Sequence, residues 1–294
     1  MRRGTLRVSG GLLETAWWGP GPAEAPTLVL LHEGLGCIDL WRNVPEQLAE
    51  STGRGVFAYS RFGYGRSDTT GLPRPVTYMH TEALDVLPEV LAAAGIGRYV
   101  LAGHSDGGSI AAIYAGSLAA DAASPVSNVP RVSPVPRVSW PGLARPSTTS
   151  SGSAFSHDLI GLVTIAAHFF VEDLNISSIE RIKTEYETSN LRDRLARYHQ
   201  DVDTAFWGWN GAWLNPDFRR FDITEFLPNI DVPILAIQGA DDPYGTDEQL
   251  RVFEAAVHAP ITVELIPGAR HSPHLEAKDA TLAAITRFIT ELPT

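Results

Sequence analysis

Residues 98–108 read RYVLAGHSDGG, an apolar run that ends in the pattern G-x-S-x-G around Ser105. A helical pattern follows over residues 109–118, which places the serine at a strand-to-helix turn. Such a turn holds the serine in a strained conformation and exposes its hydroxyl above the carboxyl edge of a sheet. Glycines at 103 and 107 leave room for the strand and the helix to approach the turn. We therefore predict that Ser105 is a nucleophile.

Short β-rich runs alternate with helical patterns on both sides of this turn. The expected strands cover residues 6–9, 12–18, 27–32, 55–60, 98–103, 161–166, 232–238 and 261–266. The first two flank Gly10-Gly11, a two-residue hairpin signal, and the later runs are apolar, as in strands buried on both faces. Helical patterns cover residues 41–51, 77–94, 109–118, 246–257 and 277–292. This order predicts an α/β fold with an eight-stranded, mostly parallel sheet and helices on both faces.

Two segments interrupt the alternation. Residues 171–230 are helical, charged and rich in tryptophan, and we interpret them as a helical cap over the strand ends; extra helices packed elsewhere on the sheet are the alternative. Residues 121–157 are rich in Pro and Ser, a composition that predicts a flexible surface insertion, with a docking tract or lid extension as the alternative. The expected core is therefore formed by residues 1–170 and 231–294.

A serine hydroxyl is a weak nucleophile, so it needs a general base and a carboxylate that orients the base. Two apolar runs end in loops that supply such residues: GADD at 239–242 and PGARHSPH at 267–274. Both loops follow the carboxyl ends of expected strands, where open α/β sheets bind ligands. We predict Asp242 as the acid and His271 as the base. The alternatives are Asp241, which we interpret as a helix cap, and His274, which we expect to hydrogen-bond the backbone.

The oxyanion of an acyl-transfer intermediate needs hydrogen-bond donors. The amide of Asp106, directly after the nucleophile, is one candidate. The second lies in HEGLG at residues 32–36, where glycines let the backbone turn its amides inward. We favour Gly34, with Leu35 as the alternative donor and a plain tight turn as the purely structural interpretation.

Together these pieces resemble the α/β-hydrolase family, and in detail its small bacterial capped members. The matching stretches are HEGLG at 32–36, SRFGYGRS at 60–67, GHSDGG at 103–108, GADD at 239–242 and HSPH at 271–274. Glu33 stands where the family usually has a glycine. The resemblance, which extends to esterases, enol-lactonases and ring-cleavage-product hydrolases, implies an α/β-hydrolase fold and cofactor-free hydrolysis through an acyl-enzyme.

The expected activity is cleavage of a carboxylic ester, thioester or lactone, with no metal and no cofactor. The cap tryptophans suggest a substrate with an apolar portion, and Leu35, Trp207 and Trp213 are the candidate substrate-binding residues. A carbon–carbon bond hydrolase for vinylogous diketo acids is the alternative, and it would need Arg42 or Arg61 for the substrate carboxylate. A catalytically inactive binding protein is less favoured, because all three members of the triad are present.

The composition disfavours several other classes. The net charge of −11 and the absence of clustered basic residues argue against nucleic acid and anionic membranes as partners. Cys37 is the only cysteine, so neither an intrachain disulfide nor a cysteine-based metal site is expected. No stretch has the roughly 20 apolar residues of a membrane span, and the N-terminus does not read as a signal peptide. We expect a cytoplasmic enzyme, monomeric or homodimeric, with a small-molecule substrate.

Overall fold

The computed structural model describes residues 1–122 and 158–293 and is built on one 8-stranded sheet of order β1-β2-β4-β3-β5-β6-β7-β8. Strand β2 runs antiparallel to both β1 and β4, and the other neighbours pair in parallel. The predicted α/β sheet is therefore confirmed. The strands are β1 (Arg2–Val8), β2 (Gly11–Trp18), β3 (Thr27–Leu31), β4 (Gly55–Tyr59), β5 (Arg98–His104), β6 (Asp158–Ile165), β7 (Ile234–Gly239) and β8 (Ile261–Ile266).

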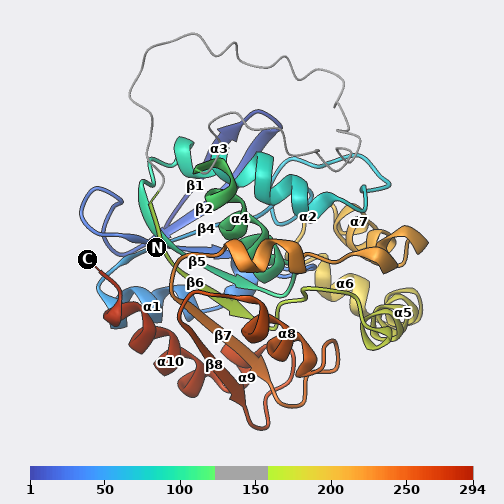
Figure 1. The fold of residues 1–294 in the computed structure, drawn as a ribbon. Coiled ribbons are helices and arrows are strands. Elements are labelled where there is room, and N and C mark those ends of the chain that lie inside the picture. Colours follow the sequence, from blue (N-terminus) through green and yellow to red (C-terminus); the bar gives the residue numbers. More distant parts are fainter. Residues whose placement is uncertain (123–157, 294) are drawn as a thin grey trace.

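Helices cover both faces of the sheet (Figure 1). They are α1 (Val44–Thr52), α2 (Tyr78–Thr81), α3 (Leu87–Ala93), α4 (Asp106–Ala122), α5 (Asp173–Thr188), α6 (Leu191–Leu195), α7 (Val202–Trp213), α8 (Glu248–Ala256), α9 (Pro273–Glu276) and α10 (Lys278–Glu291). Shorter turns are η1 (Ile38–Trp41), η2 (Glu82–Val86), η3 (Pro216–Arg220) and η4 (Thr224–Asn229). The apolar residues of α1 and α10 join one core cluster, and those of α3, α4 and α8 join the other.

Strand β3 shows why the sheet needs cover on both sides. All five of its residues are buried, and successive side chains point to opposite faces. Val29 and Leu31 therefore enter one core cluster, whereas Leu28 and Leu30 enter the other. A continuous apolar run is the sequence signature of such a strand.

Two details differ from the expectation. The hairpin turn lies one residue earlier than Gly10-Gly11, because Val8 pairs with Gly11 and leaves Ser9 and Gly10 as the turn. Strand β8 is not buried on both faces, and Leu265 is 46% exposed. This strand lies at the edge of the sheet, where it has only β7 as a neighbour.

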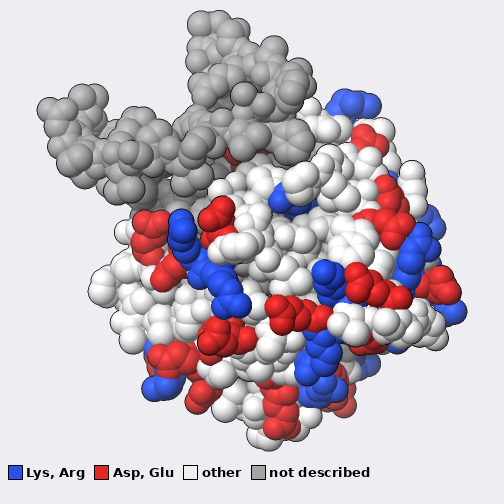
Figure 2. Space-filling view, turned by 90° about the vertical axis from the view of Figure 1, so that its right-hand side faces the viewer, with Lys and Arg blue, Asp and Glu red and all other residues white. Residues whose placement is uncertain are grey.

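Residues 171–230 connect β6 to β7 and form α5, α6, α7, η3 and η4. We call these residues the cap. Among the residues that the structure describes, they pair with β-type geometry only in the single bridge between Phe170 and Asp222, which joins the cap to the residue before it. On the face that carries α5 to α7, acidic and basic side chains are interspersed among uncharged ones (Figure 2).

The Pro- and Ser-rich segment that we predicted at residues 121–157 lies outside the described residues, apart from its first two positions, which belong to the last turn of α4. Among the residues that the structure describes, no helix is both long and apolar enough to cross a bilayer.

Candidate active site

Ser105 occupies a sharp turn between β5 and α4. Its φ of 52° lies in the left-handed region, which is unfavourable for a residue with a side chain. A Cβ on Gly107 would collide with the backbone of Leu31, so only glycine lets α4 approach β3 at this point. The Ser105 amide donates to the carbonyl of Ile165 at 2.8 Å, which ties the turn to β6 as well. The strain is therefore held by the two strands on either side of β5.

The structure brings Ser105, His271 and Asp242 together from loops after β5, β8 and β7. Ser105 Oγ lies 3.0 Å from His271 Nε2, and His271 Nδ1 lies 2.9 Å from both carboxylate oxygens of Asp242. A carboxylate only accepts, so Nδ1 carries the proton and the neutral ring offers Nε2 as an acceptor to the serine hydroxyl. The arrangement can accept a proton from Ser105.

Burial and charge act in opposite directions on this pair. Burial lowers the pKa of His271, but the hydrogen bond and charge of Asp242, with Glu33 and Asp106, raise it above its ordinary value overall. Burial raises the pKa of Asp242, yet the hydrogen bond and charge of His271 hold it below its ordinary value. The Asp242 side chain is only 1% exposed, so water screens this interaction weakly.

Asp241 and His274, the alternatives to Asp242 and His271, do not make the contacts that we expected of them. Asp241 is exposed and does not cap the following helix; Thr246 Oγ1 accepts from the Glu248 amide at its start. His274 packs its ring against Trp41 and His104, with centroids 5.0 and 4.5 Å away, and its buried Nδ1 has no partner among the described residues. It therefore contributes aromatic packing behind His271 rather than the expected backbone hydrogen bond.

Asp106 turns its side chain into the protein. Tyr78 Oη donates to its Oδ2 at 2.5 Å and Trp213 Nε1 to its Oδ1 at 3.3 Å. Its amide stands at the N-terminus of α4, where backbone N–H groups lack intrahelical acceptors. The position that we predicted as an oxyanion donor thus has its side chain engaged elsewhere.

Arg61 joins this turn to the loop after β3. It is fully buried and donates from Nη1 to the carbonyl of His32 at 2.6 Å and from Nη2 to that of Glu33 at 2.9 Å. Nη2 also lies 3.8 Å from Asp106 Oδ2. The Glu33 carbonyl and the Gly34 amide belong to one trans peptide and point in opposite directions. Arg61 therefore holds the Gly34 N–H turned away from itself.

The two arginines that we considered for a substrate carboxylate differ in their surroundings. Arg61 is occupied by the two carbonyls, and its place in the R-x-G-x-G-x-S stretch was the only sequence signal for it. Arg42 is exposed, and its Nη1 donates to Tyr198 Oη at 3.0 Å.

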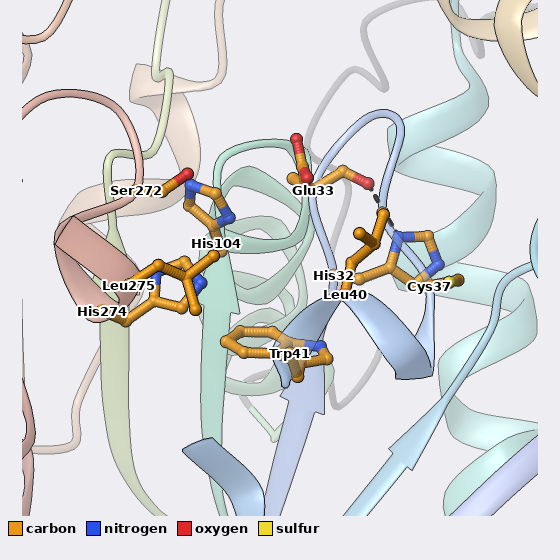
Figure 3. A pocket seen from close by; sticks show the side chains of 10 residues that line it. His32, Glu33, Cys37, Leu40, Trp41, His104, Ser272, His274 and Leu275 are labelled. Atoms are coloured by element: carbon orange, nitrogen blue, oxygen red, sulfur yellow. Dashed lines mark hydrogen bonds between the residues drawn. The ribbon is translucent and has the colours of Figure 1, made fainter. Parts of the chain in front are cut away.

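A small pocket opens beside the triad, under the loop after β3. Figure 3 shows His104, His274 and Ser272 on one side of it, with Trp41 below and Glu33 above. Burial raises the pKa of the Glu33 carboxyl, and nearby Asp106 adds to this effect, whereas His271 and Arg61 lower it. Glu33 thus places a carboxyl group close to His271.

The three predicted substrate-binding residues lie in different parts of the structure, and not all of them are near Ser105. Leu35 is half-buried in the loop after β3, and its carbonyl accepts from His199 Nε2 at 3.0 Å. Trp213 is buried next to Asp106. Trp207 instead packs within the cap, against Tyr186 and Phe206, and no contact of its ring with the triad is found among the described residues.

Sequence reasoning missed Trp209, which contacts the loop after β3 directly. A Cβ on Gly34 would overlap its indole ring. Helical periodicity was the available signal, because Trp209 and Trp213 are four residues apart and share a face of α7, whereas Trp207 does not. It also missed His168, whose ring stacks on His271 at 5.7 Å.

Within residues 1–122 and 158–293, no group of three or more His, Cys, Asp or Glu side chains could hold a metal ion.

Known proteins share this architecture. Proline iminopeptidase from Levilactobacillus brevis is 24% identical over 275 residues, which cover 89% of this chain and 87% of that protein. A bacterial membrane phospholipase A has a TM-score of 0.71 at 19% identity, covering 98% of this chain and 85% of its own. The enol-lactonase from Burkholderia xenovorans has a TM-score of 0.68 at 19% identity, covering 98% of this chain and 100% of its own.

Structural likeness at this level of identity shows the fold alone, but the family is shown by the sequence. The family model described as "Alpha/beta hydrolase family" matches residues 28–284, from β3 into α10. The matched range contains the strained serine turn and the loops that supply Asp242 and His271. This chain belongs to the alpha/beta hydrolase family.

Proposed function

We propose that the protein is a serine hydrolase that cleaves a carboxylic ester, thioester or lactone through an acyl-enzyme on Ser105. The observation that carries this proposal is the continuous hydrogen-bonded series from Ser105 Oγ through His271 to Asp242. A hydroxyl becomes an effective nucleophile when a base removes its proton as it attacks, and an oriented histidine is such a base.

In the proposed reaction, His271 Nε2 takes the Ser105 proton as Oγ attacks the carbonyl carbon. The resulting imidazolium is stabilised by Asp242, which stays ionised. His271 then gives the proton to the leaving oxygen or sulfur, and the acyl group remains on Ser105. Water attacks the acyl-enzyme with His271 again as the base, and the serine is released.

The oxyanion donors in this proposal are the amides of Asp106 and Gly34. The first lies at the N-terminus of α4, where the helix dipole favours negative charge. The second is oriented by Arg61, which binds the carbonyl of the same peptide. Removing one such donor typically costs roughly 10²–10³ in kcat.

The carbon–carbon hydrolase alternative loses one of its two candidate cations. Arg61 is buried against backbone carbonyls, whereas Arg42 is exposed and donates one hydrogen bond to Tyr198 Oη. Glu33 would add a carboxyl group close to the site of a carboxylate substrate. These contacts favour a substrate whose reacting end is uncharged.

The test is hydrolysis of p-nitrophenyl esters of graded acyl length by wild type and Ser105→Ala. We expect kcat to fall by roughly 10⁶-fold in the variant, as the loss of a triad member can cost. Ser117→Ala, on the same helix, is the matched control, because the only partner of Ser117 Oγ among the described residues is the Tyr114 carbonyl. It should retain the wild-type rate.

Two further substrates separate this proposal from its neighbours. Proline p-nitroanilide measures iminopeptidase activity, and a vinylogous diketo acid measures carbon–carbon cleavage. A fluorophosphonate probe should label wild type but not Ser105→Ala. Equal ester hydrolysis by the two proteins, or no labelling of wild type, would show that Ser105 is not the nucleophile.

A further inference from the structure

His168 is a buried imidazole beside the triad that the proposed reaction does not use. It follows β6, and the sheet order places β6 between β5, which carries Ser105, and β7, which leads to Asp242. Its ring stacks on His271 at 5.7 Å and meets the Trp213 ring edge-on at 5.4 Å. Its side chain therefore lies at the same edge of the sheet as the reacting groups.

The backbone of His168 is fixed by Ser109 on α4. The His168 amide donates to Ser109 Oγ at 3.1 Å, and the same hydroxyl donates to the His168 carbonyl at 2.6 Å. These two bonds fix the backbone of His168, and the packing of its ring against His271 and Trp213 restricts the side chain. This is the kind of support that a substrate-contacting residue needs.

The neighbouring Asn175 decides which ring nitrogen of His168 carries the proton. Asn175 Oδ1 accepts from the Glu172 amide, which can only donate, and Asn175 Nδ2 donates to the Tyr244 carbonyl, which can only accept. The orientation of the amide is thus fixed by two backbone groups. Its Nδ2 lies 3.3 Å from His168 Nδ1, which must be the acceptor, so the proton is on Nε2.

None of the described residues accepts a hydrogen bond from the Nε2–H of His168, and Nε2 is not completely enclosed by protein atoms. The residue as a whole is only 3% exposed, so this donor lies in a largely buried position beside His271. Burial lowers the pKa of His168 to about 3, with the charge of His271 acting in the same direction. The ring therefore stays neutral, with one proton to donate, throughout the working pH range.

We infer that His168 donates its Nε2–H to the substrate and selects substrates with an acceptor oxygen beside the scissile ester. This inference rests on the proposed function and names a feature of its substrate: an ether, hydroxyl or carbonyl oxygen close to the ester group. The oxygen can belong to the acyl or to the alcohol part, and the experiment distinguishes the two.

The test compares chain-isosteric esters that differ by one oxygen. p-Nitrophenyl methoxyacetate and p-nitrophenyl butyrate probe the acyl side; 2-methoxyethyl acetate and butyl acetate probe the alcohol side. The ratio of kcat/KM within each pair is measured for wild type, His168→Phe and His168→Gln, so that the intrinsic reactivity of the esters cancels. We expect the ratio on one side to fall roughly three- to tenfold in His168→Phe and to be largely kept by His168→Gln, whose amide restores a donor.

His80→Phe is the matched control, because the half-buried ring of His80 contacts only Phe221 and Phe226 among the described aromatic rings. If the role of His168 were merely structural, its substitution would lower kcat/KM for both esters of a pair equally. Unchanged ratios on both sides in a folded His168→Phe protein would overturn the inference.

A second measurement is independent of turnover and of the folding of the Phe variant. In ¹⁵N-labelled Ser105→Ala, the His168 Nε2–H resonance should shift when a methoxy ester is added at millimolar concentration and not with its alkyl analogue. Equal responses, or a proton found on Nδ1, would overturn the inference. If wild type hydrolyses no ester, the proposed function fails, and this spectrum alone decides the role of His168.

Discussion

The contact between Gly34 and Trp209 makes Gly34→Ala a sharp perturbation of the site. An added Cβ would lie no more than 2.7 Å from three atoms of the indole ring, whereas real Cβ contacts essentially never fall below 3.0 Å. Trp209 is only 7% exposed and has little room to withdraw. The loop after β3 must therefore move relative to α7, and the Gly34 amide moves with it.

The expected magnitude follows from this displacement. Overpacking a well-packed contact typically costs ~1–3 kcal/mol of unfolding free energy. A shift of about 1 Å in a group that contacts the transition state can cost roughly 10²-fold in rate. We expect kcat for p-nitrophenyl butyrate to fall about 10²-fold, and the unfolding free energy from urea titration to fall by ~1–3 kcal/mol.

Gly211→Ala is the control, because it lies on the same helix as Trp209 and an added Cβ would meet nothing within 4 Å. It should leave kcat unchanged and stabilise the helix by ~1 kcal/mol. If the overlap with Trp209 is the cause, Gly34→Ala should have little effect in a Trp209→Ala background. A Gly34→Ala enzyme with wild-type kcat would refute both the steric argument and the role of the Gly34 amide.

Three further predictions follow from buried ionisable groups. Arg61→Met should lower the unfolding free energy by ~3–5 kcal/mol, because it removes the cation of a buried network. Arg66→Met, at an exposed position of the same loop, should change the unfolding free energy by no more than ~0.5 kcal/mol. The base must be neutral to accept a proton, so kcat/KM should fall as the pH drops through the raised pKa of His271, and Glu33→Gln should move this limb to lower pH, because it removes a charge that raises that pKa. Burial raises the pKa of Cys37 to about 12 and leaves it 1% exposed, so the native protein should not react with a disulfide reagent such as DTNB until urea unfolds it; rapid labelling of the folded protein would contradict its burial.

Much of the fold and the positions of the triad candidates could be predicted from the sequence. The apolar runs mark the strands, and a residue directly after a strand must lie at the carboxyl edge of a parallel sheet. Ser105, Asp242 and His271 each follow such a run, so they share one edge whatever the side chains between them do. The direction of the chain at the end of each strand is therefore enough to predict that these three residues share an edge of the sheet.

The choices inside those loops depended on packing. Adjacent residues such as Asp241 and Asp242 leave the backbone in different directions, and only the three-dimensional arrangement shows which one faces His271. Packing also decides which tryptophan of the cap contacts the loop after β3. It is Trp209 and not Trp207, because the rotation of α7 about its axis is set by its neighbours.

The order of strands and helices, the strained serine turn and the set of candidate side chains are each a property of consecutive residues, so they could be predicted without the structure. The contact of Arg61 with the Gly34 peptide and that of Asn175 with His168 became visible only in the folded structure. These contacts join residues from separate elements, and their hydrogen bonds depend on distances and directions that exist only after the elements pack together.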